Sequence, residues 1–178
     1  ALAGFNFTVR PANGEEVTTK TLPCDIVCEL AHQKAFEIAK AQTAPCYVIG
    51  ADTIVAFENR ILGKPKDRAD AVRMVSMLQG STHQVYTGVT LIEVCTDGSL
   101  REKSFYEETN VHVCQMTKDE IASYVATGEP LDKAGAYGIQ GTFSIDGSGI
   151  EGDYFNVVGL PVSRLYHEFA SFQNVAHK

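Results

Sequence analysis

The run Cys46–Phe57 is the feature that most constrains what this 178-residue chain can fold into. It is almost continuously apolar, and only Gly50, Asp52 and Thr53 interrupt it. Such a run predicts a buried strand in a covered sheet. Asp52 would then be a carboxylate inside that strand, which is costly unless it is paired, hydrogen-bonded or bound to a metal. The plainer alternative is a strand-end aspartate that binds neighbouring amides.

A second informative stretch is Leu131–Pro161, which contains seven glycines among polar residues. It is too long for a turn and too apolar at its end for a disordered linker. Glycines let backbone amides approach an anion closely, and Lys133 adds a positive charge. Gln140 lies between glycines and carries an amide that can read the edge of a base. The stretch therefore predicts a loop that handles phosphates.

The remaining sequence alternates helix and strand signals, which predicts an α/β fold. We expect helices over Pro23–Ala39, Asp67–Leu78 and Thr117–Gly128 and a last helix from Pro161, with a capping box at Thr117. We expect strands at Phe5–Val9, Cys46–Phe57, Ile61–Leu62, His83–Cys95, Leu100–Met116 and Tyr154–Val158, with turns at Glu58–Arg60 and Asp97–Gly98. No linker or repeat is visible, so residues 1–178 are expected to form a single domain.

Composition excludes several classes of partner. The net charge of −7 argues against nucleic acid, which clustered Lys and Arg usually hold. No apolar run approaches the roughly 20 residues needed to span a membrane. The five cysteines form no metal-ligand cluster: Cys24 and Cys28 lie one helical turn apart, but no second pair accompanies them, and reduced thiols are expected. The sequence shows no secretory signal, so we expect a reducing, cytoplasmic setting.

Several polar residues could join Asp52 in a site. Lys64 follows it by twelve residues across a predicted hairpin, and Lys34 lies on the preceding helix. Glu16 belongs to a polar loop, and with Asp52 it could supply the hard oxygen ligands that magnesium prefers. Thr53 could be a strand residue or a substrate contact. For the two lysines and Glu16, the alternative is a solvated surface position.

Other catalytic motifs are absent from the sequence. The histidines are not spaced to pair with a serine or cysteine nucleophile, so a catalytic triad is not expected. No GxxxxGK[ST] loop occurs, and no GxGxxG follows an early strand.

Taken together, the motifs resemble the Maf family of nucleotide pyrophosphatases. They cover nearly the whole chain in order: Gly50–Thr53, Leu62–Pro65, Gly80–Gly88, Gly128–Gly141 and Val157–Pro161. The resemblance implies a Maf/ITPase-like α/β fold, with a long mixed sheet, flanking helices and a cleft between two lobes. It also implies an upstream strand and a Ser-x-Ser-Pro-Arg-Arg segment that precede residue 1 in the family.

The resemblance also implies a function. Asp52 matches the catalytic acidic residue, Lys34 and Lys64 the cleft lysines, and Glu16 a loop carboxylate. Thr53 and Gln140 match positions that distinguish the branch acting on dTTP and UTP. The expected reaction is hydrolysis of a nucleoside triphosphate to the monophosphate and pyrophosphate, with a divalent cation, magnesium or manganese. Family members are commonly homodimers.

Two alternatives remain open at the level of sequence. One is a pyrophosphatase for a modified purine nucleotide such as 7-methyl-GTP, which the residues at 53 and 140 argue against by resemblance. The other is a nucleotide-binding regulator of septum formation that has no turnover of its own.

Overall fold

The computed structural model describes residues 6–58 and 60–175. Its helices and strands follow one another as α1 (Pro23–Lys40), β1 (Cys46–Phe57), β2 (Arg60–Leu62), α2 (Arg68–Leu78), β3 (Thr82–Val94), β4 (Leu100–Val113), α3 (Lys118–Ala126), β5 (Gly147–Glu151), α4 (Tyr154–Val158) and α5 (Val162–Val175). Three short 3-10 helices lie between α3 and β5: η1 (Glu129–Asp132), η2 (Ala134–Ala136) and η3 (Thr142–Ile145). Within this described part, no helix combines the length and apolarity needed to cross a membrane.

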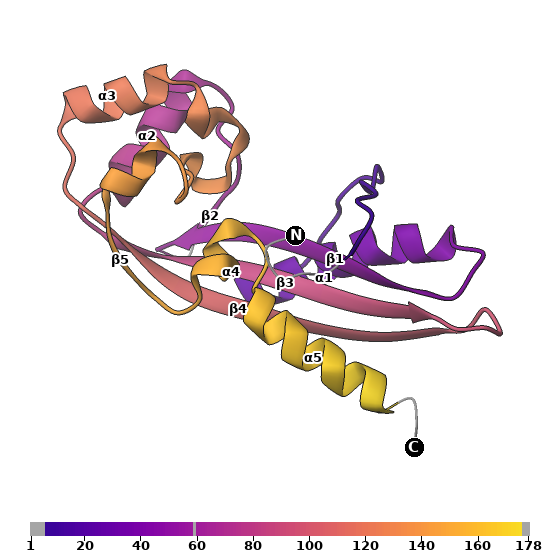
Figure 1. Cartoon of the computed structure of the whole chain (residues 1–178). Helices are drawn as coiled ribbons and strands as arrows, with labels where there is room; N and C mark the ends of the chain where they lie inside the picture. Colours follow the sequence, from indigo (N-terminus) through magenta and orange to yellow (C-terminus); the bar gives the residue numbers. More distant parts are fainter. Residues whose placement is uncertain (1–5, 59, 176–178) are drawn as a thin grey trace. The chain divides into compact units, whose positions relative to one another are not determined.

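The five strands form one sheet in the order β2-β1-β3-β4-β5 (Figure 1). The α/β fold with flanking helices is therefore confirmed. The resemblance led us to expect a mixed sheet, whereas β1 pairs with β2, and β4 with β5, in antiparallel fashion. Strands β1 and β2 can pair only in this way, because two residues join them and a parallel pair needs a long crossover connection.

The chain divides into two compact units. Unit 1 comprises residues 1–52, 88–106 and 160–178, and unit 2 comprises residues 53–87 and 107–159. Two units agree with the expectation of two lobes, while the cleft between lobes and the single-domain assignment stay predictions.

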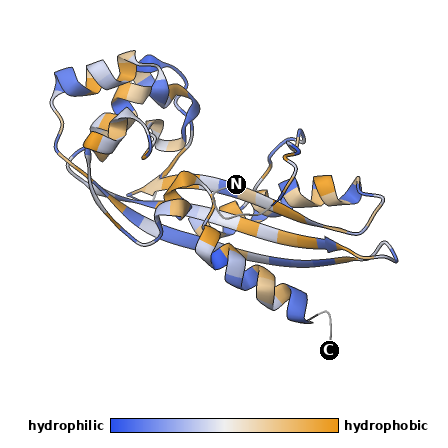
Figure 2. Ribbon diagram, in the orientation of Figure 1, coloured by the Kyte–Doolittle hydropathy of each residue, from blue (hydrophilic) through white to orange (hydrophobic). Residues whose placement is uncertain are grey.

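In unit 1, α1 lies close to β1 and β3 because both strands carry a glycine beneath it. A Cβ atom added at Gly50 would lie 2.4 Å from the carbonyl oxygen of Ala31, and one at Gly88 would lie 2.2 Å from that of Val27. Figure 2 shows α1 with alternating apolar and polar stretches, as an amphipathic helix requires. Its buried residues are Ile26, Val27, Leu30, Ala31, Ala35 and Ala39.

In unit 2, α2 and α3 pack together over a core that also includes Val55, Val85 and Phe143 (Figure 1). Both helices begin where the sequence predicted. Asp67 caps α2 by accepting a hydrogen bond from the amide of Asp70, and Thr117 and Glu120 form the predicted capping box of α3.

Two strand predictions need correction, and one strand was not predicted. Residues 6–9 form no strand, and Phe5 lies outside the described residues. Tyr154–Val158 is the helix α4, because the Asp153 side chain caps its first turn and Gly159 ends it at φ +119°. The last strand is instead Gly147–Glu151, whose glycines hide the strand pattern. Asn59, in the predicted turn at 58–60, lies outside the described residues.

Candidate active site

Helix α1 and strand β1 bring Lys34 and Asp52 together within unit 1. Gly50 allows the close approach of the helix, and Asp52 lies two residues further along the strand, on the same face as Gly50. Lys34 Nζ lies 2.5 Å from Oδ1 of Asp52. The absence of a side chain at position 50 thus helps to form the ion pair.

Burial and charge have opposing effects on this pair. The Asp52 side chain is 10% exposed, and burial raises the pKa of its carboxyl although the hydrogen bond from Lys34 lowers it. Burial alone would lower the pKa of the Lys34 ammonium, but its hydrogen bonds to Asp52 and Glu16 outweigh burial and raise it. A charged lysine therefore lies beside a carboxylate that is more basic than an ordinary aspartate.

Glu16 reaches the same lysine from the N-terminal loop. Its Oε1 atom lies 3.0 Å from Lys34 Nζ. Two side chains of α1 fasten this loop: Gln33 Oε1 accepts from the amide of Val17, and Glu37 accepts from the amides of Asn13 and Gly14. The loop is irregular, but these bonds hold Glu16 near the ion pair.

The donors Glu16 and Asp52 fit a divalent cation only in part. Across residues 6–58 and 60–175, no group of three or more His, Cys, Asp or Glu side chains could hold a metal ion. Magnesium is often bound by one or two carboxylates together with substrate phosphates. These two carboxylates therefore fit such an ion when phosphate oxygens complete its coordination.

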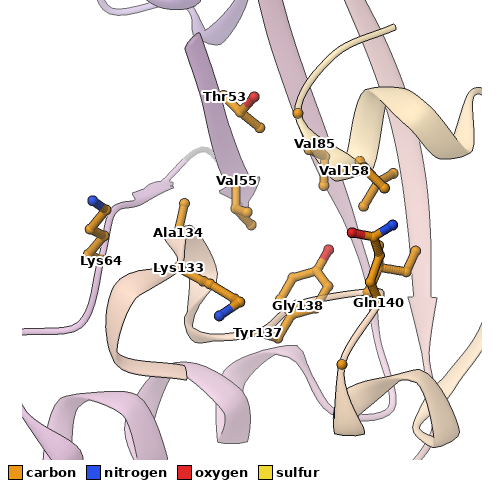
Figure 3. Close-up of a pocket in the computed structure, with 14 residues that line it drawn as sticks. Thr53, Val55, Lys64, Val85, Lys133, Ala134, Tyr137, Gly138, Gln140 and Val158 are labelled. Carbon is orange, nitrogen blue, oxygen red and sulfur yellow. The ribbon is translucent and has the colours of Figure 1, made fainter. Parts of the chain in front are cut away.

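A cavity of about 320 Å³ lies within unit 2 (Figure 3). Its volume is at the lower end of the range for small-molecule sites, roughly 300–1,000 Å³. Figure 3 shows Lys64 on one side and Gln140 on the other, with Tyr137 between them. The lining residues come from β1, β3, the segment between β2 and α2, residues 133–141 (the glycine-rich loop) and the α4 region: Thr53, Val55, Lys64, Val85, Lys133, Ala134, Tyr137, Gly138, Ile139, Gln140, Gly141, Val157, Val158 and Gly159.

The hydroxyl of Thr53 bonds to that of Thr87, which is in turn held by Asn156, and all three residues belong to unit 2. Its Oγ1 lies 2.9 Å from Oγ1 of Thr87, which is completely buried. The Thr87 hydroxyl in turn donates to the main-chain carbonyl of Asn156, at 2.9 Å. Strands β1 and β3 and helix α4 therefore fix the orientation of Thr53 at the cavity.

Lys133, one of the two lysines that line the cavity, has hydrogen-bond partners in its own loop. Lys133 Nζ donates to the carbonyl of Glu129 at 2.9 Å and to Oδ1 of Asp132 at 2.7 Å. The pKa of the Asp132 carboxyl is lowered, first by the hydrogen bond from Lys133 and, to a smaller degree, by the charge of Lys64. Both ammonium groups thus add positive charge to this end of unit 2.

Glu129 anchors the glycine-rich loop. Its Oε2 accepts from the amide and the hydroxyl of Thr142, at 3.0 and 2.7 Å. A Cβ atom at Gly141 would lie 1.9 Å from Oε1 of Glu129, so a side chain at position 141 would displace the carboxylate. The side chain of Glu129 therefore joins the two ends of the segment that carries Gln140.

Tyr137 is fixed by a buried histidine. His83 Nε2 lies 2.6 Å from the Tyr137 hydroxyl, and the two rings meet edge to face. Burial, with a smaller effect of the charge on His112, lowers the pKa of His83 to about 4, so the ring is neutral at neutral pH. Burial raises the pKa of Tyr137, which keeps its hydroxyl protonated.

The structure thus places the predicted residues in two groups. Asp52, Lys34 and Glu16 meet in unit 1, whereas Thr53, Lys64, Lys133 and Gln140 line the cavity of unit 2. Sequence reasoning did not single out the residues that support them: Gln33, Glu37, Thr87, Glu129, Tyr137 and Asn156. The segments Gly80–Gly88 and Gly128–Gly141 contain three of these and were the available signal.

The chain is similar to known proteins over nearly its whole length. A family model described as "Maf-like protein" matches residues 1–172. The chain is 51% identical over 177 residues to the dTTP/UTP pyrophosphatase of Agathobacter rectalis, covering 93% of this chain and 86% of the relative. It is 49% identical over 169 residues to that of Lachnoclostridium phytofermentans, with 95% and 86% covered. It is 47% identical over 178 residues to that of Bacillus anthracis, with 99% and 90% covered.

Proposed function

The chain belongs to the Maf family, and we propose on that basis that it is a nucleoside triphosphate pyrophosphatase acting on dTTP and UTP. The reaction releases the nucleoside monophosphate and pyrophosphate. The observation that carries the proposal is the Lys34–Asp52 pair, a buried carboxylate of raised pKa held 2.5 Å from an ammonium. Perturbed groups of this kind are frequent in catalytic sites.

In the proposed mechanism, Asp52 accepts a proton from the attacking water. Lys34 is bonded to Oδ1 of Asp52, so we assign the proton to Oδ2. The water oxygen forms a bond to the α-phosphorus, and the bond between that phosphorus and the α–β bridging oxygen breaks. Pyrophosphate leaves with the bridging oxygen. A raised pKa makes Asp52 a better base at neutral pH than an exposed aspartate.

The cations of the chain handle the triphosphate. Phosphoryl-transfer enzymes rely mainly on positioning and charge neutralisation. We assign these tasks to Lys34, Lys64 and Lys133. Glu16 would help to hold a divalent cation, magnesium or manganese, which when bound neutralises phosphate charge; binding of that cation by Asp52 is the alternative to its role as the base. Chelation by EDTA should abolish turnover, and added Mg²⁺ or Mn²⁺ should restore it.

Thr53 and Gln140 contact the base in this proposal. Uracil and thymine present the O4 acceptor and the N3–H donor, and an amide side chain can pair with both kinds of group. A site that hydrogen-bonds a base edge rejects bases that leave its polar groups unpaired. The cavity of about 320 Å³ in unit 2 supports this role because Thr53 and Gln140 both line it.

A panel of nucleotides tests the function. Purified protein with Mg²⁺ or Mn²⁺ is given dTTP, UTP, CTP, ATP, GTP and 7-methyl-GTP, and pyrophosphate and orthophosphate are measured separately. We expect pyrophosphate from dTTP and UTP far above that from ATP or GTP. Preferred hydrolysis of 7-methyl-GTP would assign the protein to the purine branch. Tight binding of a triphosphate without turnover would indicate a regulator.

Two further properties are proposed from the family alone. We expect a homodimer, which sedimentation analysis of the purified protein can test. We also expect a cytoplasmic location, which fractionation of the source cells can test.

A further inference from the structure

The hydrogen-bonded chain from Thr53 through Thr87 to Asn156 has a fixed direction. A carbonyl oxygen can only accept, so the single hydroxyl proton of Thr87 points to the carbonyl of Asn156. Thr87 therefore has no proton left for Thr53. The 2.9 Å contact between the two hydroxyls then requires Thr53 to donate its own proton to Thr87.

The Asn156 carbonyl, which accepts from Thr87, is held in place by further hydrogen bonds of its residue. Asn156 is completely buried, and its Nδ2 atom donates to the carbonyl of Val85 and to the hydroxyl of Thr109, each at 3.0 Å. Its carbonyl also accepts from the amide of Gly159 in the turn that ends α4. The acceptor that orients the Thr87 hydroxyl is thus part of a buried network.

The consequence appears at the cavity. Thr53 has used its only proton, so its hydroxyl offers lone pairs alone to a ligand in the cavity that it lines. We propose that Thr87 is a positioning residue that makes Thr53 an obligate hydrogen-bond acceptor, and that the site thereby selects pyrimidines with an N3–H donor. Uracil and thymine carry this donor, whereas N3 of cytosine is an acceptor. The inference rests on the proposed function, because it presupposes that the base lies in this cavity.

The test compares UTP with CTP in variants of Thr87. Wild type should prefer UTP in kcat/KM, by about tenfold or more, as expected where one buried hydrogen bond is replaced by two facing acceptors. Thr87→Val keeps the shape but removes the hydroxyl, so Thr53 can turn its proton toward N3 of cytosine. The UTP/CTP ratio should fall toward one, whereas Thr87→Ser, which keeps the hydroxyl, should retain the wild-type ratio.

A double variant separates this role from a general packing role. If Thr87 acts through Thr53, Thr53→Val and the Thr53→Val/Thr87→Val double variant should have the same UTP/CTP ratio. An unchanged ratio in a folded, active Thr87→Val protein would overturn the inference, and so would ratios that multiply in the double variant. A wild type that hydrolyses neither UTP nor dTTP would instead contradict the proposed function.

Binding of products gives a second measurement that needs no variant. If neither Thr87→Val nor Thr87→Ala folds, calorimetry on the wild type with UMP and CMP replaces the kinetic comparison. An acceptor at Thr53 predicts that UMP binds about tenfold more tightly than CMP. Equal affinities would overturn the inference.

Discussion

Lys34 and Asp52 illustrate how one close contact can serve both structure and chemistry. The aspartate is buried within a strand, and the lysine keeps it charged by opposing the effect of burial on the pKa. Removing Lys34 would leave the charge of Asp52 buried without compensation, whereas Lys34 would still be paired with Glu16 if Asp52 were removed. The geometry therefore makes the proposed base sensitive to its neighbour.

The first prediction concerns the acid limb of the pH–rate profile. The hydrogen bond from Lys34 lowers the pKa of Asp52, while burial raises it. Lys34→Met removes only the lowering effect, so the pKa of Asp52 should rise and the acid limb of kcat for dTTP should move to higher pH. Lys40→Met removes a lysine from the same helix and is the control. An acid limb that stays in place, or moves to lower pH, would exclude Asp52 as the titrating base.

Gln140 gives a second prediction at the scale of single residues. Gln140→Glu preserves the size of the side chain but replaces a donor with a second acceptor, which cannot bond O4 of uracil or thymine. The preference for dTTP over GTP in kcat/KM should shrink by about ten- to a hundredfold. Gln42→Glu makes the same charge change in unit 1 and should leave the preference unaltered. If the Gln140 variant keeps its preference, the amide does not read the base.

At the scale of elements, β3 and the glycine-rich loop are joined by the bond between His83 and Tyr137. The His83 Nδ1 atom has no partner among the described residues, so protonation would place an unpaired charge in a buried site. The loop that shapes the cavity is thus coupled to a group that must stay neutral.

This coupling predicts a pH dependence of stability. His83 has a pKa of about 4 in the folded chain, against 6.5 for an ordinary histidine. Between these values the unfolded chain binds a proton that the folded chain does not, so the free energy of unfolding falls as pH falls from 6.5 to 4. The full effect of lowering the pKa of His83 from 6.5 to about 4 is about 3 kcal/mol. Below about pH 4 the contribution of His83 levels off.

Denaturant unfolding at several pH values checks this prediction. His83→Gln removes the titration and should flatten the curve between pH 4 and 6.5. His167→Gln, at an exposed position, is the control. A slope that persists in the His83 variant would assign the acid sensitivity to other groups.

Elements differ in how well their sequence predicts them. The caps of α2 and α3 could be predicted because Asp67 and Thr117 bond amides of their own first turns. By contrast, α4 is rich in aromatic and β-branched residues and resembles a strand, and the flanking Asp153 and Gly159 decide the outcome. Strand β5 pairs with β4 although its glycines give no strand pattern.

Residues of the candidate site also differ in how well the sequence predicts them. Asp52 could be predicted because a carboxylate in an apolar run needs a partner, and Lys34 provides one. Thr87 and Asn156 could not, because a threonine in a strand and an asparagine near a turn are ordinary choices for those positions. Their importance depends on long-range hydrogen bonds that pair residues 69 positions apart.

At the scale of the whole molecule, the proposed catalytic and base-binding residues belong to different units. Asp52 ends the first segment of unit 1, and Thr53 begins unit 2. The two are consecutive residues of β1, so the peptide bond keeps their Cα atoms about 3.8 Å apart. Side chains of successive strand residues point to opposite faces. One strand therefore supplies the proposed base and, at the next residue, the acceptor that reads the pyrimidine.

The central claim is that this chain uses Asp52 to release pyrophosphate from dTTP and UTP. The most direct test measures pyrophosphate formation from dTTP, with Mg²⁺, by wild type and by Asp52→Asn protein whose fold is verified by its unfolding curve. Asp97→Asn, the same change in an exposed turn, is the control. We predict that the Asp52 variant loses roughly two to four orders of magnitude in kcat, as expected for loss of a general base, while the Asp97 variant does not. Near-normal turnover by a folded Asp52→Asn protein would contradict the account.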